Sequence, residues 1–229
     1  MKIIHISDTH NRHSKVRNIP DGDVLVHSGD ISNIGHQDDV VSFIKWFNTW
    51  PHEQKIFIAG NHDRSFDPKF NTEVDPLTGE KTNDRPKWLS ELLSSLPDNI
   101  HYLEDSSVVI DGKRFWGSPW TPWFHGTYWG FNKHRGDPIR EVWKGIPMKT
   151  DVVITHGPPA HKLDWVKSGE LVGCHDLTYF IEMIKPKVHL FGHIHESYGI
   201  TETPDTIYSN ASIMNEYYES VNKPIEIEI

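Results

Sequence analysis

The stretch IFIAGNHD, residues 56–63, joins four apolar residues to a glycine and three polar side chains. A continuous apolar run of this length predicts a strand that is buried on both faces. The residues after it include an amide (Asn61) and an imidazole (His62), which are both able to bind metal ions. Taken alone, Gly60-Asn61 is equally typical of a left-handed turn.

Four more strand-like runs end in residues of the same kind. Residues 3–6 lead into Asp8-Thr9-His10, 24–26 into Gly29-Asp30, 152–154 into His156-Gly157, and 188–191 into Gly192-His193-Ile194-His195. Binding sites of α/β proteins lie at the carboxyl ends of strands. We therefore interpret seven residues as candidate metal ligands: Asp8, His10, Asp30, Asn61, His156, His193 and His195. Each fragment alone has a purely structural explanation, but their joint occurrence after strand-type runs favours a site.

Helical patterns alternate with these strands, and a sixth strand-like run lies at 108–110. Apolar residues recur at helical spacing at Val40, Ile44 and Phe47, and again between Leu177 and Ile184, while residues 87–96 and 138–146 are further candidates. This alternation predicts an α/β fold. The polar segment 71–85, which carries Pro76 and Gly79, is expected to be a surface excursion. With 229 residues, we expect one domain spanning 1–229.

Composition limits the classes of function. A net charge of -9 argues against a partner that is a long nucleic acid. The sixteen histidines and a single cysteine, Cys174, indicate metal sites built from nitrogen and oxygen rather than sulfur, and Cys174 is expected to be a buried apolar residue rather than a nucleophile. No run is long enough to span a membrane and no signal peptide is evident, so we expect a cytoplasmic protein without a membrane partner.

The order of the motifs resembles a known family, the calcineurin-like metallophosphoesterases. Its blocks are Asp-x-His, Gly-Asp, Gly-Asn-His-Asp/Glu, a later His and Gly-His-x-His, all of which are found between Asp8 and His195. Three segments, GSPWTPWF at 117–124, THGPP at 155–159 and FGHIHE at 191–196, together with Asn210-Ala211-Ser212, look like its metallophosphoesterase-domain-containing subgroup.

The resemblance implies a four-layer sandwich of two mixed β-sheets flanked by helices. It also implies that Asp8, His10 and His195 hold one divalent ion, that Asn61, His156 and His193 hold a second, and that Asp30 bridges the two. Mixed nitrogen and oxygen ligands suit manganese, iron, nickel or zinc better than calcium. A hydroxide that bridges the ions would attack the phosphate. His62 is the expected catalytic residue, protonating the leaving oxygen and oriented by Asp63, although it could also simply pack against the loop.

The expected activity is that of a dinuclear metal-dependent phosphodiesterase acting on small nucleotide phosphodiesters such as cyclic nucleotides. A phosphomonoesterase uses the same metals. A protein phosphatase is disfavoured because residues 31–35, after Gly29-Asp30, lack the arginine that such enzymes carry in their Gly-Asp-x-Val-Asp-Arg-Gly block. A non-catalytic scaffold is disfavoured because scaffolds of this superfamily are expected to lose metal ligands, and all seven are present here. The aromatic segment 115–131 is interpreted first as a packed loop, with stacking of a nucleobase by Trp120 or Trp123 as the alternative.

Overall fold

A computed structural model describes residues 1–74 and 81–229, with only the backbone described at 72–74 and 81–83. Its helices are α1 (Gln37–Asn48), α2 (Lys87–Ser94), α3 (Asp137–Trp143) and α4 (His175–Ile184). Its strands are β1 (Lys2–Ile6), β2 (Val24–His27), β3 (Gln54–Phe57), β4 (Thr72–Val74), β5 (Lys81–Asn83), β6 (Ile100–Tyr102), β7 (Ser106–Ile110), β8 (Lys113–Ser118), β9 (Thr121–Pro122), β10 (Asn132–Lys133), β11 (Val152–Thr155), β12 (Val188–Phe191), β13 (Gly199–Glu202), β14 (Ile207–Asn210) and β15 (Ile225–Glu228).

Two mixed sheets form the centre of the molecule. The first sheet has the order β15-β1-β2-β3-β6 and is parallel except for β15, which runs antiparallel to β1. The second sheet has the order β13-β14-β12-β11-β8-β7, in which the four inner strands are parallel and the two outer strands are antiparallel to their neighbours. Parallel strands end at a common edge, so the loops after them are brought together.

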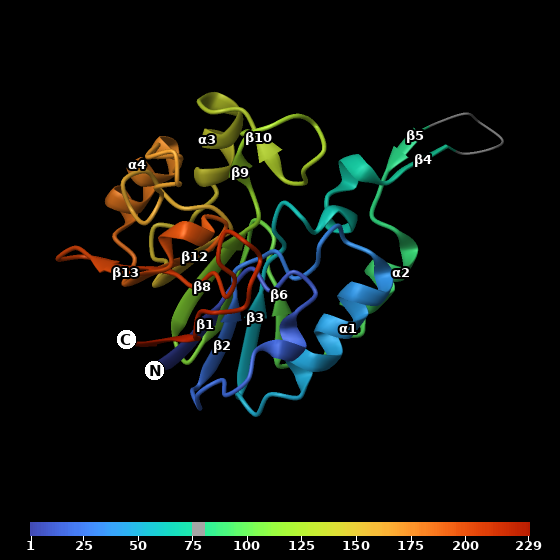
Figure 1. Cartoon of the computed structure of the whole chain (residues 1–229), viewed down its shortest axis with the longest axis horizontal. Coiled ribbons are helices and arrows are strands. Elements are labelled where there is room, and N and C mark those ends of the chain that lie inside the picture. The colour runs from blue at the N-terminus through green and yellow to red at the C-terminus, as the bar shows by residue number, and fades with distance from the viewer. Residues whose placement is uncertain (75–80) are drawn as a thin grey trace.

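The sheets pack face to face, and helices cover their outer faces. Ile3 and Val26 of the first sheet and Val152 and Leu190 of the second share one buried cluster. Helices α1 and α2 pack on the outside of the first sheet, and α3 and α4 on the outside of the second (Figure 1). The prediction of an α/β fold, with two mixed sheets flanked by helices, is confirmed.

Some predicted elements differ from those observed. Helices α1 and α4 bury the apolar residues that identified them, whereas α2 and α3 end at Ser94 and Trp143, before the predicted limits. β7 is wrongly expected to be buried on both faces: it lies at the sheet edge beside β8, and Val109 is 55% exposed. In the predicted surface excursion, β4 and β5 pair in antiparallel fashion and project from the rest of the molecule, while Pro76 and Gly79 lie outside the described residues.

The two ends of the chain lie side by side (Figure 1), because β15 pairs with β1. The N-terminal amino group donates a hydrogen bond to the carbonyl of Ile229, at 2.9 Å. Within residues 1–74 and 81–229, no helix combines the length and apolar character that crossing a membrane requires.

Candidate metal centre

All seven predicted ligands lie where parallel strands of both sheets end. The first sheet places four of them, two after β1 and one each after β2 and β3: Asp8, His10, Asp30 and Asn61. The second sheet places the others after β11 and β12: His156, His193 and His195. Five of the seven are buried and the remaining two are partly buried. The site therefore forms only when the two sheets pack together.

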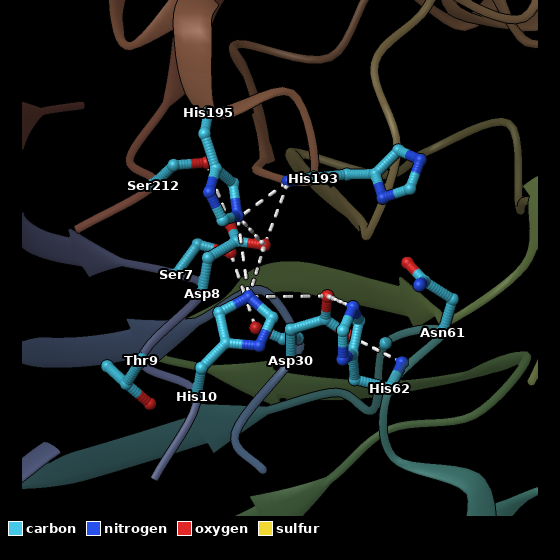
Figure 2. Close-up of polar contacts among 12 residues, drawn as sticks. Ser7, Asp8, Thr9, His10, Asp30, Asn61, His62, His193, His195 and Ser212 are labelled. Carbon is cyan, nitrogen blue, oxygen red and sulfur yellow. Dashed lines mark hydrogen bonds and ion pairs between the residues drawn. The ribbon is translucent and has the colours of Figure 1, made fainter. Parts of the chain in front are cut away.

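One group of candidate ligands consists of Asp8, His10 and His195 (Figure 2). The Nε2 atoms of His10 and His195 are 3.4 Å apart, and Oδ1 of Asp8 lies 3.5 Å from Nε2 of His195. The Asp8 carboxylate is fixed because it accepts hydrogen bonds from the His193 backbone N–H at 3.0 Å and the Ser212 hydroxyl at 2.8 Å. Bonds of ~2.0 to 2.2 Å to a shared ion would place ligand atoms ~3 to 3.6 Å apart. Two of the three spacings suit one metal ion, and the third, 4.0 Å between Nε2 of His10 and Oδ1 of Asp8, needs only a small shift of a side chain.

A second group consists of Asp30, His156 and His193. Oδ2 of Asp30 lies 3.2 Å from Nε2 of His156, and Oδ1 of Asn61 lies 3.0 Å from the same nitrogen. In Figure 2 the ring of His193 is directed toward Asn61, away from His195. Oδ2 of Asp30 is also 3.7 Å from Nε2 of His10 in the first group. A third group, His10, Asp30 and His62, overlaps with these two, and Asp30 lies between the first group and the second.

The charges of the site also suit cations. Asp8 and Asp30 are buried, and within the described residues their ion-pair partners are histidines, with no lysine or arginine. Burial works to raise the pKa of both carboxyl groups, but interactions with His195 and His156 outweigh it and hold both pKa values below their usual range. Burial likewise opposes protonation of His156, yet the charge and hydrogen bond of Asp30 raise its pKa to about 9. Histidines are the only ion-pair partners of these buried carboxylates among the described residues, and divalent ions would neutralise the remaining negative charge.

Several candidate ligands have backbone conformations that most residues avoid. Asp8, His10, Asp30 and His193 have φ of 53°, 40°, 55° and 69°. Such left-handed residues each cost ~1 to 3 kcal/mol and concentrate at functional sites. Four of the seven candidate ligands thus carry this backbone strain.

Two motif glycines are required by close packing rather than by a turn. Neither Gly60 nor Gly192 has a positive φ. A Cβ atom on Gly60 would meet Asp30, and one on Gly192 would meet Asp8 and Ser7, each closer than the 3.0 Å limit that real Cβ contacts respect. The left-handed turn considered for Gly60-Asn61 is therefore wrong, because these glycines make room for carboxylates.

His62 is held beside the site by a residue that the sequence did not indicate. Its Nδ1 donates to the Asn33 carbonyl at 2.7 Å, and its Nε2 lies 4.0 Å from Oδ2 of Asp30. The expectation that Asp63 orients His62 is wrong. The Asp63 carboxylate instead accepts hydrogen bonds from backbone N–H groups of the loops after β2 and β3, including Ile31 at 3.1 Å and Gly60 at 2.8 Å. Asp63 thus joins two ligand-bearing loops.

Three further buried histidines support the same loops. His5 is hydrogen-bonded to the hydroxyls of Ser28 and Ser209, both at 2.9 Å, and so links the two sheets. His27 contacts the Thr9 hydroxyl at 3.0 Å, and His189 contacts the Thr155 hydroxyl at 2.8 Å. Burial lowers the pKa of each of these three histidines to about 3. The sequence pattern that could have indicated this role is a histidine inside an otherwise apolar strand, as in β1, β2 and β12.

The segment Asn210-Ala211-Ser212 also supports the site. The Asn210 side-chain N–H donates to the Ile194 carbonyl at 2.8 Å, and its Oδ1 accepts from the Ser212 backbone N–H at 3.1 Å, which leaves the Ser212 hydroxyl to donate to Asp8. Asn210 is fully buried. Its side chain therefore holds Ile194 and Ser212 together through hydrogen bonds, a role that the sequence did not predict.

Aromatic rings surround the candidate ligands. Trp129 lies against His62 with ring centroids 4.3 Å apart, Tyr218 against His10 at 5.0 Å, and Phe124 against His193 at 5.2 Å. The alternative role for Trp120 is wrong: its Nε1 donates to Asp105 at 3.0 Å, and its ring packs against Phe131 and not against the site. Cys174 is buried as expected.

Comparison with known proteins points in the same direction. The family model described as calcineurin-like phosphoesterase matches residues 1–197. The chain is 41% identical to human metallophosphoesterase domain-containing protein 1, over all of this chain and 71% of that protein. It is 37% identical to UPF0046 protein K07C11.7 of Caenorhabditis elegans, over 98% of this chain and 74% of the relative. The crystal structure of the Thermus thermophilus protein TT1561 has the same fold, with a TM-score of 0.62 and 11% identity over 92% of this chain and 88% of the other.

Proposed function

The chain belongs to the calcineurin-like phosphoesterase family, and from this premise we propose that it is a dinuclear metal-dependent phosphodiesterase of small nucleotides, including cyclic nucleotides. Enzymes of this family use a dinuclear divalent metal site. The observation that carries the proposal is the position of Asp30, whose Oδ2 lies 3.2 Å from His156 and 3.7 Å from His10. One carboxylate thus reaches both groups of candidate ligands.

The proposed division of ligands follows these two groups. Asp8, His10 and His195 would hold one ion, Asn61, His156 and His193 the other, and Asp30 both. When bound, the two ions would supply an ionised water as nucleophile and neutralise the phosphate oxygens.

His62 is the proposed proton donor. Because its Nδ1 donates to the Asn33 carbonyl, its Nε2 is the nitrogen left to face the site. In the imidazolium form, Nε2–H gives its proton to the departing ester oxygen. The ring of Trp129, 4.3 Å away, limits rotation of His62 and keeps Nε2 directed inward.

The arginines around the site favour a diester over a monoester. A monoester carries most of a second negative charge at neutral pH, which a free guanidinium would neutralise. Two arginines near the site are bound to backbone carbonyls, Arg12 to that of Tyr218 and Arg135 to those of Val172 and Gly173. Arg64 lies against the rings of Phe70 and Tyr128, and its buried Nε has no partner among the described residues. With Arg12 and Arg135 held by backbone carbonyls, little positive side-chain charge is left for the second negative charge of a monoester. A diester has no such second charge and is therefore favoured.

The overall charge favours a small substrate. A chain with a net charge of -9 repels polyanions, whereas the field of two bound ions acts over about a Debye length of ~8 Å. One phosphate fits within that reach.

Competition kinetics test the proposal. After chelation and reconstitution with manganese, we expect about two ions per chain and a higher kcat/KM for 2',3'- or 3',5'-cyclic nucleotides than for nucleoside monophosphates. Asp30→Ala should weaken the binding of both ions. Full activity with one ion would contradict the dinuclear site, and a higher kcat/KM for a monophosphate or a single-stranded oligonucleotide would contradict the proposed substrate.

A further inference from the structure

A cavity of about 340 Å³ opens directly beside His193. Its volume is within the range of small-molecule sites, which start at ~300 Å³. Most of its wall is apolar and includes Trp123, Phe124, Pro158, Val166, Val172 and Ile194. The wall combines the loop after β9 with loops that follow β11 and β12.

The cavity and the candidate metal centre share a side chain. His193 lines the cavity and also belongs to the group with Asp30 and His156. Its ring contacts that of Phe124 in a T-shaped arrangement, with centroids 5.2 Å apart. A phosphate bound at the centre can therefore extend a substituent into the cavity.

Two aromatic side chains of the wall are available to a ligand. Trp123 and Phe124 are each 42% exposed, although large aromatic residues gain most from burial. Trp123 is held in place because its Nε1 donates to the Gly126 carbonyl at 2.8 Å. A planar ring entering the cavity would cover apolar surface that the protein itself leaves open.

The polar part of the cavity consists of Arg135 and Glu196. The guanidinium of Arg135 is bound to the Val172 and Gly173 carbonyls, at 2.7 and 2.6 Å, so it supports the wall. The Glu196 carboxylate makes one long contact, 3.4 Å from the Lys167 N–H, and can accept further hydrogen bonds. A nucleobase matches this lining, because its flat faces can cover the apolar wall and the N–H groups at its edge can donate to Glu196.

The position of His62 indicates which ester group enters. His62 packs against His10 and Trp129, whereas the cavity adjoins His193 and Phe124. The leaving oxygen belongs near His62, because that is where its proton would come from. We propose that the cavity binds the aromatic ring of the ester group that stays on phosphorus, a nucleobase in the natural substrate. This inference rests on the proposed function and adds the place where the ring is recognised.

Direct binding tests the subsite without turnover. Calorimetry on the manganese-loaded protein would compare phenylphosphonate with methylphosphonate, which share the anionic group and differ in the ring. We expect phenylphosphonate to bind about tenfold more tightly, within the range that stacking on an aromatic residue provides. Phe124→Ala, which removes the wall, and Val166→Trp, which fills the cavity, should each bring the ratio of affinities near one. Tyr179→Ala, an exposed aromatic residue of α4 away from the cavity, should keep the wild-type ratio.

Kinetics provide the second measurement. Phenyl 4-nitrophenyl phosphate and methyl 4-nitrophenyl phosphate release the same nitrophenolate, so their ratio of kcat/KM reports on the retained group alone. We expect the phenyl diester to be preferred about tenfold by the wild type and not by the Phe124 or Val166 variants. Equal binding of the two phosphonates by the wild type would overturn the subsite and leave the metal centre intact. Failure of both phosphonates to bind would overturn the proposed function and, with it, the subsite.

Discussion

Gly192 is required at the metal site because there is no room for a side chain at this position. A Cβ atom there would overlap the Asp8 carboxylate and the Ser7 hydroxyl. Asp8 cannot move aside easily, because it also accepts hydrogen bonds from His193 and Ser212. The glycine of the Gly-His-x-His motif is thus part of the metal site, although it offers no ligand atom.

We expect Gly192→Ala to displace Asp8 and reduce the metal content toward one ion per chain. Gly112→Ala is the matched control: Gly112 has φ of 76° and open space around it, so alanine adds backbone strain without a clash. The control should lose ~1 to 2 kcal/mol of stability and keep its metal. Elemental analysis and urea unfolding separate the two effects, and a Gly192→Ala protein with full metal content would contradict this role.

His62 gives a second prediction. A proton donor matters most when the departing alcohol is poor and least for nitrophenolate, which leaves without help. We expect His62→Gln to lower kcat by ~10² or more for alkyl leaving groups and far less for nitrophenyl esters, with metal content unchanged. The measurement is kcat over a series of leaving groups. Equal losses across the series would assign His62 to packing.

The candidate site could be predicted from sequence better than its supports. Asp8, Asp30 and His193 each follow a recognisable apolar strand, so their types and order were enough to group them. Ser212 and Tyr218 come from loops without such a pattern, and they reach the site only through tertiary packing.

At the level of elements, continuous apolar runs predict some of the strands, and the other strands lack such a run. β8 begins with Lys113-Arg114 and contains Gly117, so its aromatic residues were assigned to a loop. β15 alternates buried isoleucine with exposed glutamate, a period-two pattern without a continuous apolar run. The central strands of each sheet carry the strongest pattern because they are buried on both sides.

His5 connects one element of each sheet. It lies on β1 and is hydrogen-bonded to Ser209 of β14 as well as to Ser28 after β2. We expect His5→Phe to lower the free energy of unfolding by ~2 to 5 kcal/mol, because two buried hydroxyls lose a partner. His101→Phe is the control, since His101 makes one hydrogen bond, to Gln54, at the outer strand β6. Urea unfolding measures both, and a His5 variant no less stable than the control would contradict the link.

For the whole molecule, the C-terminal part of the chain completes a site that the earlier part begins. Residues 198–229 lie beyond the family match. They nevertheless supply the Ser212 hydroxyl to Asp8 and the Asn215 carbonyl to Nδ1 of His195, at 3.0 Å. β15 then pairs with β1, so the last strand holds the strand that leads to Asp8. Truncation before β14 would therefore remove supports of the site as well as two strands of the sheets.

Stability should depend on pH through the buried histidines His5, His27 and His189, whose pKa values burial lowers to about 3. In the unfolded chain a histidine binds a proton near pH 6.5, so below that pH the unfolded state holds protons that the folded state excludes. Through these three histidines the free energy of unfolding falls as the pH drops from 6.5 toward 3, whereas His156, whose pKa is raised to about 9, acts in the opposite sense and only above pH 6.5. In this window each histidine lowers the free energy of unfolding by ~1.4 kcal/mol per pH unit, and the three together lower it by ~4 kcal/mol per pH unit.

Carboxyl groups add their own pH dependence, so the informative quantity is the difference between the wild type and a variant that lacks one of these histidines. His189 is the best choice, because its single hydrogen bond, to Thr155, leaves Nδ1 without a partner among the described residues. We expect metal-free His189→Phe to lose ~1.4 kcal/mol less stability per pH unit than the wild type between pH 6 and pH 4. Urea unfolding at several pH values in chelator measures this slope. His36→Asn, at the exposed start of α1, should keep the wild-type slope. Parallel stability curves for His189→Phe and the wild type would mean that His189 is protonated in the folded protein, and would contradict the neutral buried histidines on which the loops of the site rest.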